Sequence, residues 1–317
     1  MIPTPDHMRE ILKATLLQER GPQARLLDWS RDAHFTEHGK RRVVRYDLQV
    51  EAGDVGVEAL QWLAKIYDRP DEGSRVAVVL RALAHGESGR RGAMAVPRVL
   101  AYHPEFRLLL MTYESGESVS SAIARDTAAL LAAMGRALAA LHGAAVPIVD
   151  VHSAAAVLDD LRPRVEELAA RLPQEAESLR LALRRLERDG PPQPPILGFV
   201  HGDFGPANLL WRPEELVVLD FDKCGRGDPA ADLGNLLAQL RRMTVRKPEK
   251  LREFAPARAA VLAAYREWSP PDPDLDRRVA WYERAILLRK VHRIALVAAP
   301  VSEETTRLLR VCESHAA

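Results

Sequence analysis

One stretch of the sequence, residues 199–236, brings together carboxylates and an amide that could bind a divalent cation. These residues are Asp203, Asn208, Asp220 and Asp222. Mg²⁺ prefers oxygen ligands, takes few of them from protein and completes its shell with phosphate oxygens. Asp203 precedes Asn208 by five residues and would be free to meet a substrate hydroxyl. The spacing therefore predicts phosphoryl transfer, in which a metal neutralises phosphate charge while a carboxylate orients the attacking oxygen.

Two short apolar runs are expected to position these groups. Residues 209–211 and 216–220 are apolar and β-prone, and a charged run with one proline separates them. This pattern predicts a hairpin that ends at Asp220. Asp228 and Asp232 follow on the next loop and helix start, where solvated turn or helix-cap positions are expected for both.

Residues 42–113 predict strands with one helix. The predicted strands are 42–50, 58–67, 97–102 and 106–113. In the second of these, apolar residues alternate, so that Lys65 would lie on the opposite face. The spacing of Val76, Val79, Leu80 and Leu83 is that of one face of an amphipathic helix.

Helical patterns dominate after Gly116. Leucine-rich stripes recur at helical spacing in residues 130–141, 158–172 and 179–186, and again from residue 232 onward. We therefore predict an α+β chain with two lobes. The first, residues 1–112, would be a small antiparallel-sheet lobe, and the second, residues 113–317, would be larger and mainly helical.

The string HGDxxxxN at 201–208, followed by a hydrophobic strand ending in Asp220, resembles a known pattern. It is similar to the catalytic loop and metal-binding segment of the aminoglycoside phosphotransferase and choline kinase superfamily, related to HRDxxxxN and DFG of protein kinases. The string GDPAADL at 227–233 matches that superfamily's usual continuation. The resemblance implies a two-lobed protein-kinase-like fold. It also implies an ATP (or GTP)-dependent enzyme that transfers the γ-phosphate to a small-molecule hydroxyl, as on an aminoglycoside, a sugar or a choline-like metabolite.

The resemblance also implies roles for single residues. Asp203 matches the catalytic aspartate that accepts or orients the proton of the acceptor hydroxyl. Asn208 and Asp220 match the ligands of Mg²⁺, and Asp222 would assist the metal or hold the loop. The residues that would brace the catalytic loop are His201 and Asp232.

A nucleotide site is implied in the first lobe. Lys65 lies on the strand where such kinases place the lysine that contacts the α- and β-phosphates. Residues 107–116 resemble the last strand of that lobe and the hinge. The adenine would bind main-chain atoms near Thr112, Tyr113 and Glu114, with Met111 lining the pocket.

Two positions depart from the superfamily pattern. The glutamate that usually pairs with the lysine aligns with Val76, and Glu72 could replace it if the helix starts earlier. No GxGxxG string occurs in residues 30–40, which offer only Gly39. These departures leave open a catalytically weakened pseudokinase or nucleotide-binding regulatory module.

Two other enzyme classes fit less well. Asp220-Phe221-Asp222 is a DxD string, as in metal-dependent glycosyltransferases, but helices precede it and HGDxxxxN lies just upstream. A protein kinase would need an activation segment with an APE element, which is absent.

Composition excludes several classes of protein. The 317 residues are 47% hydrophobic and 28% charged, with a formal net charge of +1 at pH 7, so neither a nucleic-acid nor a membrane partner is expected. Cys224 and Cys312 are too few for a disulfide framework. No secretion signal or long apolar run is present, and a cytoplasmic location is expected. The oligomeric state stays open.

The acceptor also stays open. Acidic side chains would suit a polycationic aminoglycoside, and the candidates are Glu267, Asp272, Asp274, Asp276 and Glu283. The run 269–276 is expected to be a solvated loop. The segment 277–293 is instead rich in Arg, Lys and His, which would fit an anionic acceptor if those side chains faced the cleft. Periodicity predicts that most of them face water.

Overall fold

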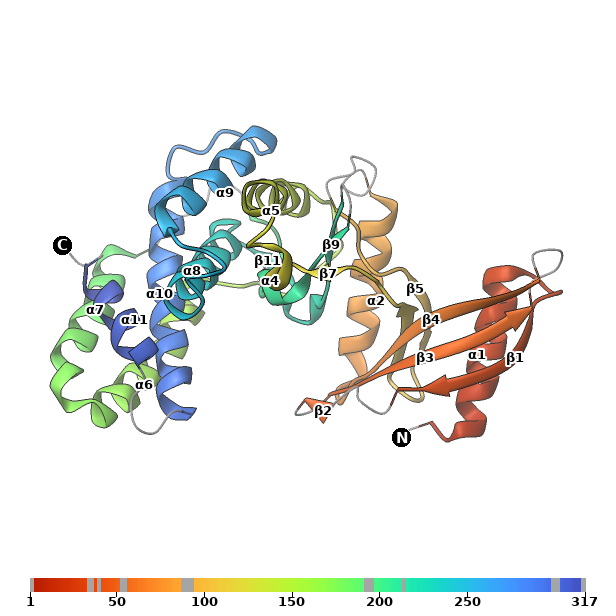
Figure 1. Cartoon of the computed structure of the whole chain (residues 1–317). Helices are drawn as coiled ribbons and strands as arrows, with labels where there is room; N and C mark the ends of the chain where they lie inside the picture. Colours follow the sequence, from red (N-terminus) through yellow and green to blue (C-terminus); the bar gives the residue numbers. More distant parts are fainter. Residues whose placement is uncertain are drawn as a thin grey trace. The chain divides into compact units, whose positions relative to one another are not determined.

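The computed structural model describes residues 3–32, 37–38, 41–51, 56–86, 94–190, 197–212, 215–297 and 303–314. Much of the 30–40 region, Gly39 included, lies outside these residues. The chain forms two compact units, one from residues 1–89 and 95–115 and the other from residues 90–94 and 116–317. Figure 1 shows the elements of each unit.

An antiparallel sheet with strand order β1-β3-β4-β6-β5 forms the first unit, and β2 pairs with β3. The strands are β1 Arg25–Arg31, β2 Glu37–His38, β3 Arg41–Glu51, β4 Val57–Ile66, β5 Val99–His103 and β6 Leu108–Thr112. The four predicted strands correspond to β3, β4, β5 and β6 and are confirmed. Strand β1 was not predicted, because its residues are mostly exposed and do not alternate.

Within the described part of the first unit, helices α1 Pro5–Arg20 and α2 Pro70–His85 accompany this sheet. Helix α1 lies along one face of the sheet in Figure 1, and its apolar residues join the sheet residues in one core. That shared core includes Met8, Ile11, Leu12, Leu16, Tyr46, Leu48, Val50, Trp62 and Ala64. In α2 the predicted apolar face is buried, which confirms that helix.

Helices dominate the second unit. They are α4 Val119–Ala122, α5 Thr127–His142, α6 Ala154–Arg171, α7 Ala176–Asp189, α8 Ala230–Arg246, α9 Phe254–Trp268, α10 Leu275–Val297 and α11 Glu303–Ser314. Helix α5 packs on α9 and α8 packs on α10 (Figure 1). The predicted α+β class is therefore confirmed. None of the helices in the described ranges is long and apolar enough to cross a membrane.

Among the described residues of the second unit there are also five short strands. They are β7 Glu117–Ser118, β8 Gly198–Val200, β9 Leu209–Arg212, β10 Glu215–Val218 and β11 Gly225–Gly227. Strands β10, β9 and β7 form one small sheet, and β11 pairs with β8 in another. The antiparallel pairing of β9 with β10 confirms the predicted hairpin. Since β8 precedes the HGD string and β10 precedes Asp220, these small sheets hold both ends of the site.

Candidate active site

His201 joins the two segments of the site. Its Nδ1 accepts a hydrogen bond from the amide of Asp203 at 3.2 Å, so the ring proton lies on Nε2. Nε2 in turn donates to the carbonyl oxygen of Leu219 at 2.9 Å. The buried imidazole therefore fixes the loop carrying Asp203 against the residue that precedes Asp220.

Asp232 anchors the same loop from helix α8. Its carboxylate accepts hydrogen bonds from the amides of His201 at 2.6 Å and Gly202 at 2.9 Å. His142, at the end of α5, lies 3.3 Å away through Nε2 and is held by the hydroxyl of Tyr265 at 2.9 Å. Burial alone would raise the pKa of Asp232, but these partners hold the pKa below its usual value.

The expectation that Asp228 and Asp232 are solvated was wrong. Asp232 is 1% exposed and Asp228 is 3% exposed. The buried Asp228 pairs with Arg278 of α10, which lies 3.0 Å from its carboxylate, and accepts a hydrogen bond from the amide of Ala230, the first residue of α8. Burial raises the pKa of Asp228, although Arg278 opposes that rise. Both aspartates therefore belong to buried polar networks, which a single sequence cannot distinguish from solvated turns.

Gly202 is required by the geometry of the loop. Its φ is +77°, and a Cβ there would lie 2.2 Å from the carbonyl oxygen of Lys223. Only glycine adopts this conformation at such a close approach. The glycine of the HGD string therefore allows the catalytic loop to pack directly on the segment that follows Asp220 and Asp222.

Asn208 is held by its own loop. Its side-chain amide donates to the carbonyl oxygen of Asp203 at 3.0 Å, which fixes the orientation of its Oδ1 atom. Asp220 adopts a left-handed backbone with φ 63°. This conformation is uncommon for L-residues, although Asn and Asp adopt it more readily than others, and such backbone conformations cluster at functional sites. Asp222 follows in a short 3-10 turn and is 7% exposed.

The donor set suits Mg²⁺. Asn208, Asp220 and Asp222 offer amide and carboxylate oxygens, the hard ligands that Mg²⁺ prefers. Within the described ranges no three His, Cys, Asp or Glu residues form a metal-binding group. A site with two carboxylates and one amide agrees with that finding, because Mg²⁺ usually completes its shell with water and phosphate oxygens.

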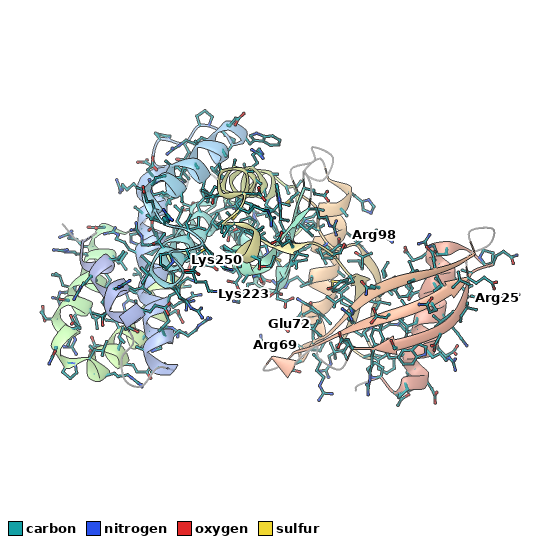
Figure 2. The ribbon with its side chains drawn as sticks, viewed as in Figure 1. Arg25, Arg69, Glu72, Arg98, Lys223 and Lys250 are labelled. Carbon is teal, nitrogen blue, oxygen red and sulfur yellow. The ribbon has the colours of Figure 1, made fainter. Side chains whose placement is uncertain are left out.

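Lys223 is a site residue that the sequence reasoning missed. Its ammonium lies 2.7 Å from Oδ2 of Asp203. Figure 2 labels Lys223, which directly follows Asp222 in the chain. Its position directly after the DxD string is the sequence feature that could have identified Lys223 as a site residue.

Lys290 of α10 is a second cation that interacts with Asp203. Burial lowers the pKa of Lys290 to about 8, against the opposing effect of Asp203. Arg242, Arg293 and Arg289 also lower it. The sequence reasoning named Lys290 only as one member of a basic segment.

The basic residues of α10 correct another expectation. Arg277, Arg289 and Arg293 are exposed as predicted, but Arg278 and His292 are buried. His292 contacts Glu167 of α6, and Arg278 pairs with both Asp228 and Asp272. Because α10 packs against both α8 and α6, more of its circumference is buried than the sequence pattern indicated.

The nucleotide-site candidates lie together in the first unit. Lys65 of β4 is paired with Leu109 of β6, and Leu63 is paired with Met111. Alternation therefore places Lys65 and Met111 on the same face of the sheet, opposite the α1 core. Glu72 lies in the first turn of α2, as Figure 2 shows.

The hinge candidates carry hydrogen bonds of their own. The amide of Thr112 donates to the carbonyl of Arg98, and that of Tyr113 donates to Gln61. The Thr112 hydroxyl donates to the carboxylate of Glu114. The amides of Thr112 and Tyr113 are therefore already engaged within the sheet.

Comparison with known proteins agrees with this geometry. A sequence model of the phosphotransferase enzyme family (APH) matches residues 45–277. No curated protein sequence matches.

Solved structures that share the fold over nearly the whole chain include the following three. The macrolide 2′-phosphotransferase MphH from Brachybacterium faecium is 21% identical, with a TM-score of 0.54, covering 97% of this chain and 98% of that one. A thermostable mutant of aminoglycoside phosphotransferase APH(4)-Ia, in a ternary complex with ADP and hygromycin B, is 15% identical, with a TM-score of 0.59 and coverage of 96% and 97%.

The third is a choline/ethanolamine kinase family protein from Mesorhizobium loti, which is 19% identical with a TM-score of 0.55. The alignment covers 97% of this chain and 94% of that one. At these identities the structures establish the fold, while the sequence model establishes the family through most of the chain. The chain belongs to the phosphotransferase enzyme family (APH).

Proposed function

We propose that this protein is an ATP (or GTP)-dependent kinase that uses Mg²⁺ and transfers the γ-phosphate to a hydroxyl group of a small molecule. The observation that carries the proposal is the pair of hydrogen bonds that link the His201 ring to the Asp203 amide and the Leu219 carbonyl. These bonds hold Asp203 and Asp220 in one fixed arrangement. Phosphoryl transfer depends mostly on such positioning and on charge stabilisation. The solved relatives include complexes with ADP or AMP-PNP together with hygromycin B, which supports a nucleotide and a small acceptor here.

Each residue has a distinct part in the proposed reaction. Asp203 accepts a hydrogen bond from the acceptor hydroxyl and receives its proton as the oxygen bonds to the γ-phosphorus. The bond between that phosphorus and the β–γ bridging oxygen breaks, which releases the nucleoside diphosphate. Asn208 and Asp220 would hold Mg²⁺, with Asp222 beside them, and the ion would neutralise negative charge on the phosphates.

The first unit would hold the nucleotide. Lys65 donates charge-assisted hydrogen bonds to the α- and β-phosphates, and Met111 lines the adenine pocket with main-chain atoms near Thr112 and Tyr113. Glu114 contributes by fixing the Thr112 hydroxyl. An ATP-dependent reaction of this kind suits the cytoplasm, which is the predicted compartment.

Metal-dependent nucleotide binding tests the proposal. Thermal shifts of the wild type, Asp220→Asn and the control Asp159→Asn are measured with ATP, GTP and UDP, each with and without Mg²⁺. Asp159 is 70% exposed in its ion pair, so its substitution leaves the site intact. We expect Mg·ATP or Mg·GTP to stabilise the wild type and the control by about 2.7 kcal/mol at a hundredfold excess over Kd.

The Asp220→Asn variant should lose this stabilisation. Stabilisation by neither purine nucleotide would refute the proposal. Stabilisation by Mg·ATP without phosphate transfer to any acceptor would favour the pseudokinase alternative. The pseudokinase alternative is supported by Val76, a buried residue at the position where the superfamily places the glutamate partner of the lysine.

A further inference from the structure

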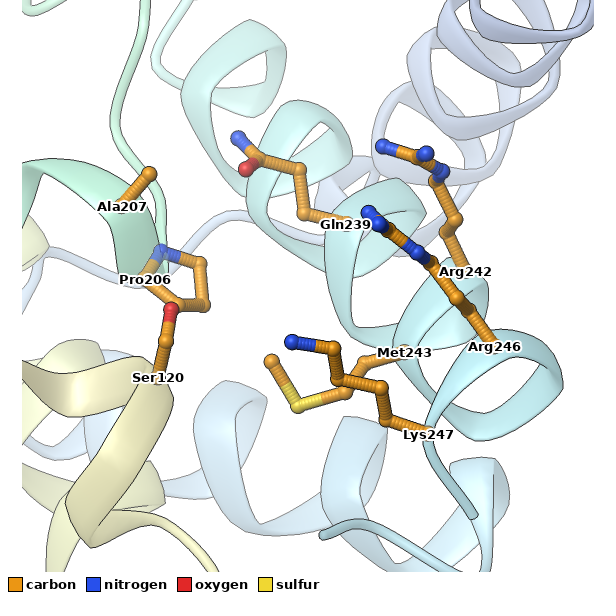
Figure 3. A pocket seen from close by; sticks show the side chains of 8 residues that line it. All are labelled: Ser120, Pro206, Ala207, Gln239, Arg242, Met243, Arg246 and Lys247. Carbon is orange, nitrogen blue, oxygen red and sulfur yellow. The ribbon is translucent and has the colours of Figure 1, made fainter. Parts of the chain in front are cut away.

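A pocket with a volume of about 180 Å³ opens beside the catalytic loop in the second unit. Its lining residues are Ser120, Pro206, Ala207, Gln239, Arg242, Met243, Arg246 and Lys247. Figure 3 shows the side chains of α8 and of Lys247 on one side of this pocket, facing Ser120, Pro206 and Ala207 on the other. The pocket therefore lies between helix α8 and the loop that carries Asp203.

The charge of the pocket is positive. Three of its lining residues are cationic and none is acidic. Arg242 is paired with Glu304 of α11, whereas the side chains of Arg246 and Lys247 form no hydrogen bond or ion pair with any residue in the described ranges. Two uncompensated cations at one pocket attract an anion, for which arginine and lysine are the usual protein ligands.

The pocket is continuous with the catalytic machinery. Pro206 and Ala207 lie in the loop between Asp203 and Asn208. Gln239 donates to the carbonyl oxygen of Phe204, the residue after Asp203, at 3.3 Å. Lys290 interacts electrostatically with both Asp203 and the pocket residue Arg242. A molecule held in this pocket would therefore contact the loop that carries Asp203.

Three of the five acidic residues that could recognise a polycation are engaged elsewhere. Asp272 pairs with Arg278, and Asp276 pairs with Arg258 and Arg266. Glu283 is 3% exposed and pairs with Arg241. Three of the five acidic candidates for an aminoglycoside site thus already have guanidinium partners.

We propose that the acceptor is a small hydroxylated molecule that carries an anionic group, a phosphate or a carboxylate, and that Arg246 and Lys247 bind this group. The proposal rests on the phosphotransferase function proposed above and adds the class of its acceptor. Arg242, already neutralised by Glu304, shapes the wall of the pocket.

The size of the pocket supports a small acceptor. Pockets for drug-sized ligands measure about 300–1,000 Å³, whereas an engineered cavity of about 150 Å³ holds a single benzene. A volume of about 180 Å³ matches one ring or a short chain with its anionic group.

Calorimetric titrations of the full-length chain test the proposal. The probes are glucose 6-phosphate, gluconate, glucose and the polycation kanamycin, each with and without a saturating non-hydrolysable ATP analogue and Mg²⁺. The test variant carries Arg246→Gln and Lys247→Gln. The control variant carries Arg277→Gln and Lys13→Gln, which remove the same charge from exposed positions. Binding of the nucleotide analogue is measured separately, so that failure of the nucleotide site and failure of the pocket are distinguished.

We expect at least one of the two anionic probes to bind the wild type more tightly than glucose or kanamycin. Its Kd should rise about tenfold or more in the pocket variant and stay unchanged in the control. Preference for glucose 6-phosphate would identify a phosphate, and preference for gluconate a carboxylate.

Three outcomes would overturn the proposal. The first is that neither anionic probe binds at millimolar concentration. The second is that the pocket and control variants weaken binding equally. The third is that the pocket variant weakens only the nucleotide analogue, which would assign the cations to the nucleotide.

Discussion

The ammonium of Lys223 lies 2.7 Å from Oδ2 of Asp203, the carboxylate proposed to orient the attacking hydroxyl. The two side chains are 56% and 35% exposed, so their ion pair adds little to the free energy of unfolding. The ion pair instead positions the Asp203 carboxylate. Lys223 holds one carboxylate oxygen and leaves the other, Oδ1, for the acceptor.

Replacing Lys223 with Met should lower kcat about tenfold, because a catalytic carboxylate that loses its positioning contact samples unproductive geometries. The KM for the nucleotide should stay unchanged. Steady-state kinetics of nucleoside diphosphate release measure both values. Lys223→Arg is the matched control and should retain most of the activity. A change confined to the nucleotide KM would instead place Lys223 on the phosphates.

Replacing Asp203 with Asn should lower kcat by about 10²–10⁴, since the amide cannot take the proton of the acceptor hydroxyl. Binding of Mg·ATP should change little, because Asp203 acts on the acceptor. Single-turnover rates and a nucleotide titration measure the two effects, with Asp159→Asn as the exposed control. Full activity in the Asp203 variant would show that another group orients the hydroxyl.

The parts of the fold and site that sequence predicts are local ones. Alternation in residues 58–67 predicts β4 and the face of Lys65, and the HGDxxxxN string fixes Asp203 and Asn208 through contacts within eight residues. The parts it misses join distant segments. The contact of Asp232 with His142 spans 90 residues, and that of Arg278 with Asp228 spans 50. Burial of such charges depends on which helices pack together, and periodicity in one helix does not contain that information.

Replacing Asp232 with Asn should destabilise the protein by about 2–4 kcal/mol, because an amide cannot satisfy both loop N–H groups and His142 at a buried position. The pKa of Asp232 is lowered on folding, so the stability that it contributes is present above its unfolded pKa. This contribution is lost as the pH falls through the folded pKa. Urea unfolding at neutral pH measures the loss, with Asp159→Asn as the control. Equal midpoints for the two variants would show that Asp232 does not anchor the loop.

Replacing Lys290 with Met should change the pH dependence of stability. Folding lowers the pKa of Lys290 to about 8, whereas the unfolded side chain has a pKa of about 10.4. Between these values the unfolded state binds more protons, so wild-type stability rises with pH across this window. Asp203 favours the charged form, while Arg242, Arg289 and Arg293 oppose it, and burial has the largest effect.

The methionine variant lacks this titration. Below pH 8 it should therefore be more stable than the wild type by about 1–2 kcal/mol, and the difference should shrink toward pH 10. Urea unfolding of both proteins at several pH values measures the difference. Lys13→Met, at an exposed position, is the control and should follow the wild-type profile. Parallel profiles for the wild type and the Lys290 variant would mean that Lys290 stays charged beside Asp203 throughout this range.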